Sequence, residues 1–217
     1  MIDVLRMTST ASVLMRRAAC DRLAVAATLD DLGRLSLPVA SFVVVSEVAG
    51  APDRGGAAWL DNSPAQAAHF PFEGRTPVLV TTNGTQALLA AAACGGQVLL
   101  ASFRDLRAVG RYLAEPGRSG PSVVLVPAGH VASGDARVED DLCAEALATL
   151  LAGGEPDFAA AAAVVRAAPH VLRRIEDAPG FSADLDAALT SDPQASVLEF
   201  HATAAGVGEI TRARMRI

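Results

Sequence analysis

The chain has 217 residues, 51% of them hydrophobic, so it can bury a substantial core and is expected to be globular. Its formal net charge of −6 provides no basic field for nucleic acid or for an anionic membrane, so neither is expected as a partner. No apolar run reaches the length of about 18 residues expected of a membrane span. The amino terminus also lacks a signal-peptide pattern, which predicts a cytoplasmic protein.

Apolar segments typical of strands alternate with segments of helical period. This alternation predicts an α/β fold, a layered fold with helices on both faces of a largely parallel or mixed sheet. The predicted strands are residues 2–5, 23–27, 42–46, 78–82, 98–102, 123–127 and 196–200. The predicted helices are about residues 8–19, 29–35, 85–93, 103–114, 138–151, 157–168 and 183–189.

Three segments interrupt this alternation. Residues 49–74 are rich in Gly, Ala, Pro and Asp without a clear period, and an ordered excursion of that length is often functional. Residues 115–121 and 153–156 are turns by composition. We divide the chain at the second turn into a core over residues 1–152 and a C-terminal part, residues 153–217, that completes the same fold.

A polar loop of Thr82, Asn83, Gly84 and Thr85 ends the apolar run at 78–80 and is followed by an Ala/Leu-rich helix. Free backbone N–H groups at a helix start attract anions, so the loop is a candidate binding site for a phosphate, sulfonate or carboxylate. An ordinary capped turn is the alternative, because Thr and Asn cap helices and Asn-Gly accepts left-handed backbone angles.

Charged residues follow two other predicted strands. Asp3 and Arg6 bracket the end of the first, where a metal ligand and a phosphate clamp would be well placed; an Asp–Arg surface pair is the alternative. Glu47 follows the apolar run at 42–45, so burial of that strand would deliver its carboxylate to the sheet edge.

Two further polar segments have both structural and functional readings. Asn62 and Ser63 precede a proline and form a turn by composition, but they are also ligand-binding candidates. Glu139 and Asp140 lie in the first turn of a predicted helix, where carboxylates interact favourably with the positive end of the helix dipole. They could also join Asp3 or Glu47 around one Mg²⁺. The histidines have no metal-ligand spacing, and only His130 is a candidate proton donor.

Four of these segments, in this order, resemble the 2-phosphosulfolactate phosphatase family over about residues 2–152. They are Asp-Val-Leu-Arg from Asp3, Asn-Ser-Pro from Asn62, Thr-Thr-Asn-Gly-Thr from Thr81 and Glu-Asp-Asp-Leu-Cys-Ala from Glu139. The resemblance implies a Mg²⁺-dependent phosphatase of the coenzyme M pathway that hydrolyses a phosphate ester of a small acidic hydroxy acid. Residues 1–152 would then be the phosphatase-like core.

The resemblance also implies a role for each candidate residue. It implies catalytic roles for Asp3, Arg6 and Glu47, with Arg6 neutralising the phosphoryl group, Glu47 orienting the attacking water and Asp3 acting as ligand or nucleophile. It implies substrate binding by Asn62, Ser63, Thr82, Asn83, Gly84 and Thr85, and metal binding by Asp3, Glu47, Glu139 and Asp140.

Three departures from the family pattern keep a second hypothesis open. Ser46 and Val48 flank Glu47 where the family has Gly and Arg, the tail beyond Gly153 lacks clear family motifs, and family members usually carry further residues before Asp3. The alternative is a noncatalytic relative that binds an anionic ligand. A sheet edge left bare by a short amino terminus would favour a homodimer.

Overall fold

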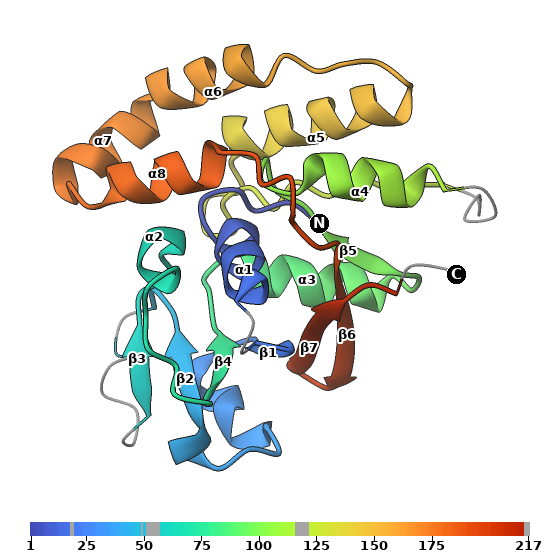
Figure 1. Cartoon of the computed structure of the whole chain (residues 1–217). Coiled ribbons are helices and arrows are strands. Elements are labelled where there is room, and N and C mark those ends of the chain that lie inside the picture. The colour runs from blue at the N-terminus through green and yellow to red at the C-terminus, as the bar shows by residue number, and fades with distance from the viewer. Residues whose placement is uncertain (18–19, 49, 51–56, 116–121, 215–217) are drawn as a thin grey trace.

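The computed structural model describes residues 1–17, 20–48, 50, 57–115 and 122–214 (Figure 1). Within these residues, one seven-stranded sheet has the order β3-β2-β4-β1-β7-β6-β5. The strands are β1 Arg22–Ala26, β2 Phe42–Val45, β3 Ala58–Leu60, β4 Thr76–Leu79, β5 Val98–Leu100, β6 Leu198–Ala204 and β7 Val207–Arg212.

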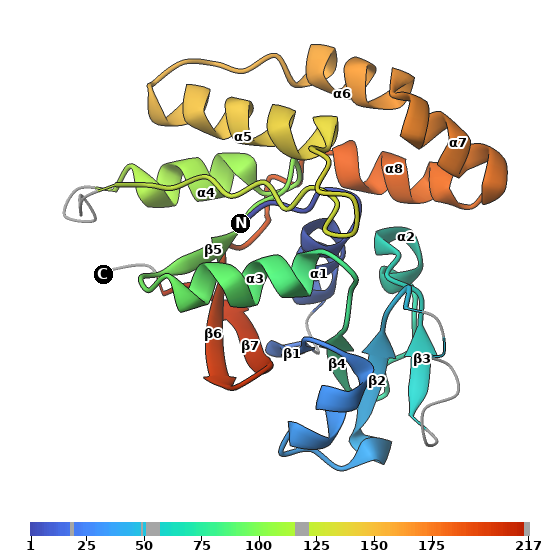
Figure 2. The ribbon, with the colours of Figure 1, turned by 180° about the vertical axis from the view of Figure 1, so that it is seen from behind.

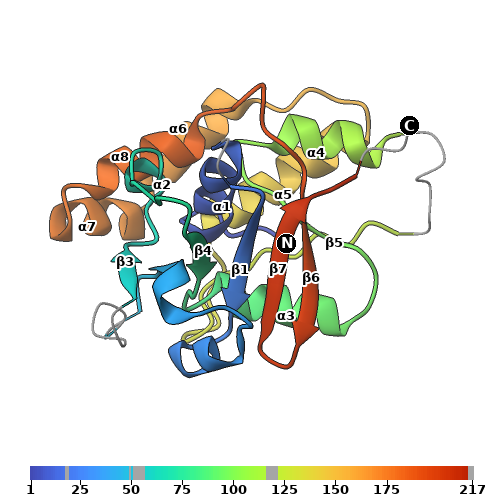
Figure 3. The same ribbon diagram turned by 60° about the horizontal axis from the view of Figure 1, so that its bottom comes forward.

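The sheet is mixed. β3, β2, β4 and β1 pair in parallel, whereas β7 joins β1, and β6 joins both β7 and β5, in antiparallel fashion. Figure 3 shows β1, β7 and β6 side by side. Every residue of β2 is buried, as expected of a parallel strand covered on both faces. The layered α/β fold predicted from the sequence is therefore confirmed.

The helices cover the sheet unequally. They are α1 Met7–Arg16, α2 Pro64–Ala67, α3 Gly84–Ala93, α4 Leu106–Leu113, α5 Val138–Leu151, α6 Phe158–Ala167, α7 Pro169–Asp177 and α8 Phe181–Leu189, with short 3₁₀ helices at Leu29–Arg34 and Val39–Ser41. Leu14 of α1 and Leu88 of α3 pack with Leu23 and Val25 on one face of the sheet. The opposite face packs against the 3₁₀ segment through Leu29.

The remaining long helices, α4 to α8, form a layer beyond α1 and α3 (Figures 1 and 2). The first residues of the chain pass between this layer and the sheet. Ile2 forms parallel bridges with both Ala101 and Pro127, and the Met1 amino group donates to the Leu99 carbonyl at 2.7 Å. Figure 2 shows the extended chain that follows residue 121 running past the amino terminus toward α5. Asp3 therefore lies where the sheet meets the helical layer.

Several predicted elements differ from the structure. The strands predicted at 2–5 and 123–127 are wrong, because only isolated bridges at Ile2 form there. The first segment is cut short where the chain turns after Asp3 to begin α1. The helix predicted at 29–35 is 3₁₀ rather than α. The helix predicted at 8–19 ends at Arg16, and residues 18–19 lie outside the described residues.

Other elements were not predicted at all. The segment at residues 49–74 contains β3 and α2, and its residues 49 and 51–56 lie outside the described part. Of the turn predicted at 115–121, residues 116–121 also lie outside the described part. β7 and α7 were missed because Gly208 and Glu209 break the apolar pattern of the strand and charged residues dominate the helix. In the part of the chain described, no helix is long and apolar enough to cross a membrane.

Candidate functional site

A cavity of about 250 Å³ lies between the strand ends and the helical layer. The residues predicted from the sequence that line it are Asp3, Arg6, Glu47, Asn62, Thr82, Asn83, Glu139 and Asp140. The other predicted residues, Ser63, Gly84 and Thr85, do not line the cavity. In the sequence, Ser63 follows Asn62, and Gly84 and Thr85 follow Asn83. The structure thus brings together side chains that are up to 137 residues apart in sequence, Asp3 and Asp140 among them.

The parallel strands explain why three of these segments meet. β2 lies between β3 and β4, so the carboxyl ends of all three strands reach the same sheet edge. Glu47 follows β2, Asn62 follows β3 and Thr82 follows β4. The contact is direct, since the Glu47 Oε1 accepts hydrogen bonds from the Thr82 N–H at 2.8 Å and from its Oγ1 at 3.0 Å.

Two buried oxygens at this edge have no hydrogen-bond partner in the described structure. One is Oε2 of Glu47 and the other is Oδ1 of Asn62. A buried acceptor without a donor is unfavourable by about 1–3 kcal/mol. Both residues line the cavity, so a bound cation, a water or a substrate hydroxyl would satisfy these oxygens.

Asp3 is held at the start of α1. Its carboxylate accepts a hydrogen bond from the Met7 N–H at 3.3 Å, and its carbonyl accepts one from the Thr8 Oγ1 at 2.7 Å. Burial raises the pKa of Asp3 to about 7, against the Met7 hydrogen bond, and the charges of Glu47 and Glu139 raise it further. The carboxylate therefore sits in a site already crowded with negative charge.

Asp140 connects α5 to the amino terminus. Its Oδ1 accepts from the Val4 N–H at 2.8 Å and its Oδ2 accepts from the Gly129 N–H at 3.1 Å. Burial, and then the charge of Asp3, raise the pKa of Asp140 to about 8. Two neighbouring carboxylates with raised pKa values form an environment that favours a cation.

The loop at 82–85 presents only part of its backbone to a ligand. The Thr85 N–H donates to the Thr81 Oγ1 at 3.0 Å, and the Thr82 N–H donates to Glu47. Asn83 accepts from the Val131 N–H at 3.0 Å through Oδ1, which ties the loop to the segment around His130. Of the predicted anion-binding amides, those of Asn83 and Gly84 have no hydrogen bond within the described residues.

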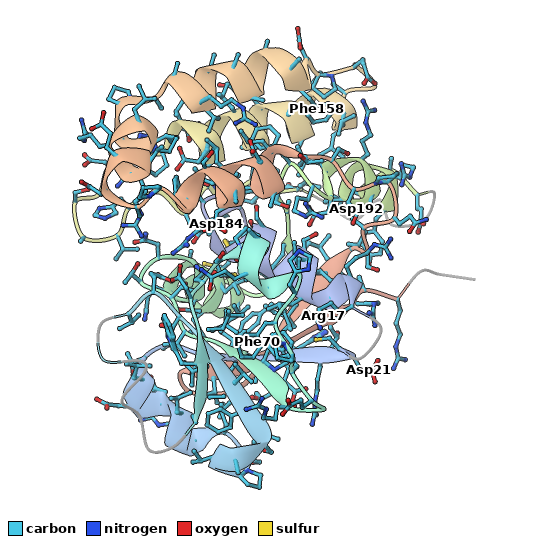
Figure 4. The ribbon with its side chains drawn as sticks, turned by 60° about the vertical axis from the view of Figure 1, so that its left-hand side comes forward. Arg17, Asp21, Phe70, Phe158, Asp184 and Asp192 are labelled. Carbon is cyan, nitrogen blue, oxygen red and sulfur yellow. The ribbon has the colours of Figure 1, made fainter. Side chains whose placement is uncertain are left out.

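Arg6 is buried and its charge is already paired. Its Nη1 donates to Asp61 Oδ2 and to Asp184 Oδ2, both at 2.7 Å, and its Nη2 donates to Asp61 Oδ1 at 3.2 Å. Asp184, labelled in Figure 4, comes from α8 and also accepts from the Ser63 Oγ and, at 3.2 Å, from the Ala65 N–H. Ser63 additionally caps α2. Arg6 and Ser63 thus join the first turn of the chain to α2 and α8.

Comparison with known proteins fits this arrangement. The family model described as 2-phosphosulpholactate phosphatase matches residues 1–199. The chain belongs to the 2-phosphosulfolactate phosphatase family. Family membership confirms the resemblance carried by the sequence motifs. The match also extends beyond residue 152, through α7 and α8.

Two curated relatives have the same printed name, probable 2-phosphosulfolactate phosphatase. The Synechocystis sp. protein is 33% identical over 177 residues, which cover 80% of this chain and 69% of that protein. The Deinococcus radiodurans protein is 35% identical over 115 residues, or 51% of this chain and 45% of that protein. The chain thus matches less than half of the length of the Deinococcus relative.

Several residues of this phosphatase-family cavity were missed by the sequence analysis. Arg137, His170, Arg174 and Phe181 all line it. His170 Nε2 lies 2.9 Å from Glu139 Oε2. Residues four apart in sequence lie on the same face of a helix, so the spacing of His170 and Arg174 could have indicated that both side chains face one site. Nothing local indicated that α7 would pack beside α5. His130, the candidate proton donor predicted from the sequence, lines the cavity as well, with Nδ1 at 2.8 Å from the Ser133 Oγ.

No preformed metal cage is present among the described residues: no three acidic, histidine or cysteine side chains converge closely enough to hold an ion. The oxygens that suit Mg²⁺ are nevertheless those described above, the crowded carboxylates of Asp3 and Asp140 and the unpartnered oxygens of Glu47 and Asn62. Mg²⁺ usually takes one or two protein carboxylates and completes its shell with water and substrate phosphate. The donor set therefore fits this ion.

Proposed function

We propose that this chain is a Mg²⁺-dependent phosphatase that hydrolyses the phosphate ester of a small acidic hydroxy acid, with 2-phosphosulfolactate as the first candidate substrate. The observation that carries the proposal is the cavity itself, because both carboxylates and arginines line it. Such a site suits a cation together with an anionic ester. Family membership and the names of the two relatives support the same reaction class.

The size of the cavity favours a small substrate. Its volume of about 250 Å³ is below the roughly 300–1,000 Å³ typical of pockets for drug-sized ligands. A three-carbon acid with a phosphate group suits that space, whereas a nucleotide does not. We accordingly place the reaction on a short hydroxy acid and, following the family, in the coenzyme M pathway of the cytoplasm.

One or two of the candidate carboxylates, Asp3, Glu47, Glu139 and Asp140, would hold the Mg²⁺ together with water and the substrate phosphate, and Asn62 Oδ1 is a further oxygen donor. When bound, the ion would neutralise phosphoryl oxygens and so stabilise the charge that develops during transfer. The protein's own contribution is the set of acidic and polar groups that lines the cavity and would position the cation and the ester.

Glu47 is the best-placed base for the attacking water. Its Oε1 is fixed by two hydrogen bonds from Thr82, whereas Oε2 has no protein partner. That oxygen is free to accept a proton from a water molecule. The unengaged N–H group of Asn83, which lines the cavity, would donate to an oxygen of the anionic substrate. This is a smaller role than the one predicted for the whole loop.

The test is phosphate release from a panel of phosphorylated hydroxy acids that includes 2-phosphosulfolactate, with Mg²⁺ and then with EDTA. We expect turnover that EDTA abolishes and Mg²⁺ restores. Undiminished turnover in EDTA would rule out the metal mechanism. A wild-type protein that releases no phosphate from any member of the panel, yet binds one of them, would instead identify a noncatalytic relative. Sedimentation of the same sample tests the proposed homodimer.

A further inference from the structure

The cavity contains two arginines that the scheme above does not use. Arg137 and Arg174 both line it, and neither has a carboxylate within ion-pair distance in the described part of the chain. Arg6 differs, because two carboxylates already pair with its guanidinium. The positive charge available to a ligand therefore comes from Arg137 and Arg174.

Both arginines occupy defined positions. Arg137 precedes α5 in extended conformation, two residues before Glu139. Arg174 lies on α7, with its guanidinium carbon 5.8 Å from the ring centroid of Phe181. Phe181 is buried, with 7% of its surface exposed, and the same ring lies 5.9 Å from the guanidinium carbon of Arg6. The buried ring thus supports Arg174 through a cation–π contact, while the NH groups remain available.

We propose that Arg137 and Arg174 form a second-anion subsite, which binds a carboxylate or sulfonate of the substrate while the phosphate lies beside the carboxylates that would hold Mg²⁺. This inference rests on the proposed function. A guanidinium presents a planar fork of donors that matches such anions. A cavity of about 250 Å³ is small, so a carboxylate or sulfonate within two bonds of the ester carbon would lie close to residues that line it. A phosphate ester without a second anion would leave both arginines unpaired.

The proposal makes Arg137 and Arg174 specificity-determining residues. Their loss should therefore affect substrates according to the anions these carry. Four phosphate esters separate the contributions: 2-phosphosulfolactate has both anions, 2-phospholactate only the carboxylate, 2-sulfoethyl phosphate only the sulfonate, and isopropyl phosphate neither. The two single-anion esters distinguish a carboxylate from a sulfonate as the group bound.

The variants are Arg137→Gln and Arg174→Gln, with Arg173→Gln as the matched control, because Arg173 is exposed on the same helix and does not line the cavity. We expect each cavity variant to lower kcat/KM for 2-phosphosulfolactate by about 10- to 100-fold, the scale of one charged hydrogen bond. For isopropyl phosphate the change should stay within about 2-fold. An equal loss on both substrates, at unchanged thermal stability, would overturn the proposal.

Calorimetric binding of unphosphorylated sulfolactate, in the presence of Mg²⁺, separates this inference from the proposed function. If the wild type hydrolyses no ester but binds sulfolactate, and each arginine substitution weakens that binding, the phosphatase assignment fails and the subsite stands. If turnover is normal and sulfolactate binding is the same in wild type and variants, the subsite is wrong and the phosphatase assignment stands.

Discussion

The Asp3 carboxylate packs directly against the backbone of Gly84. A Cβ atom added to Gly84 would lie 2.4 Å from Asp3 Oδ2 and 2.7 Å from the Met7 Cβ. Only glycine permits this approach, so the polar loop after β4 and the first turn of the chain form one unit. The contact explains how a loop residue that does not itself line the cavity controls a carboxylate that does.

Gly84→Ala should accordingly impair both activity and stability. The methyl group has to displace Asp3 or the loop, and overpacking of this kind typically destabilises by about 1–3 kcal/mol. We expect turnover to fall by about 10-fold or more and Tm to fall by about 2–4 °C per kcal/mol. Gly33→Ala is the matched control, because nothing lies within 4 Å of its Cβ position. Wild-type rates in Gly84→Ala would show that the position of Asp3 is unimportant.

Glu47→Gln tests the proposed base. The substitution keeps the shape of the side chain and an oxygen acceptor for the Thr82 hydrogen bonds but removes the charge. Turnover should fall by about 10²-fold, as for loss of a general base, while the thermal melt barely changes. Glu73→Gln, whose side chain is 72% exposed, provides the control. Equal rates in Glu47→Gln and wild type, at equal stability, would remove Glu47 from the mechanism.

Asp184 is expected to be the main structural carboxylate of the site. It accepts bonds from Arg6, Ser63 and Ala65, and removal of one partner of a buried ion pair typically destabilises by about 3–5 kcal/mol. Because Arg6 retains Asp61, we expect Asp184→Ala to lower the free energy of unfolding by about 3 kcal/mol. Asp186→Ala on the same helix removes an exposed pair with Arg166 and should change it by less than about 1 kcal/mol. Urea denaturation measures both, and similar losses in the two variants would contradict the prediction.

Asp105 should make stability depend on pH. Burial raises its pKa from the usual 3.8 to about 7, against the hydrogen bond that its Oδ1 accepts from the Ser102 N–H. Between about pH 4 and pH 7 the folded protein keeps a proton that the unfolded chain has lost, so stability falls as pH rises. One such proton corresponds to about 1.4 kcal/mol per pH unit.

Asp105→Asn should therefore flatten the stability curve over that window. Urea denaturation of wild type and variant at pH 5 and pH 7 measures the difference in slope. Asp21→Asn, at a side chain that is 97% exposed, should leave the slope unchanged. Asp3 and Asp140 contribute in the same direction, so a residual slope is expected in Asp105→Asn. An unaltered slope would mean that Asp105 is ionised in the folded protein throughout the window.

The sequence by itself determined how Glu47 and Thr82 are delivered to the site. The apolar runs before them require burial, and a buried parallel strand that ends in polar residues places those residues at the carboxyl edge of the sheet. Local pattern is enough for this, because strand formation and strand ends depend on neighbouring residues. The ordered motifs from Asp3 to Glu139 likewise carried the family assignment without any knowledge of contacts.

Only the tertiary structure decided how charge is distributed in the cavity. Arg6 was expected to be a phosphate clamp, but α8 brings Asp184 to it and β3 brings Asp61, so its charge is paired within the fold. Arg174 reaches the cavity because α7 packs between α6 and α8. These partners are set by the packing of helices that are distant in sequence, and the packing depends on the whole apolar surface of each helix rather than on any local pattern.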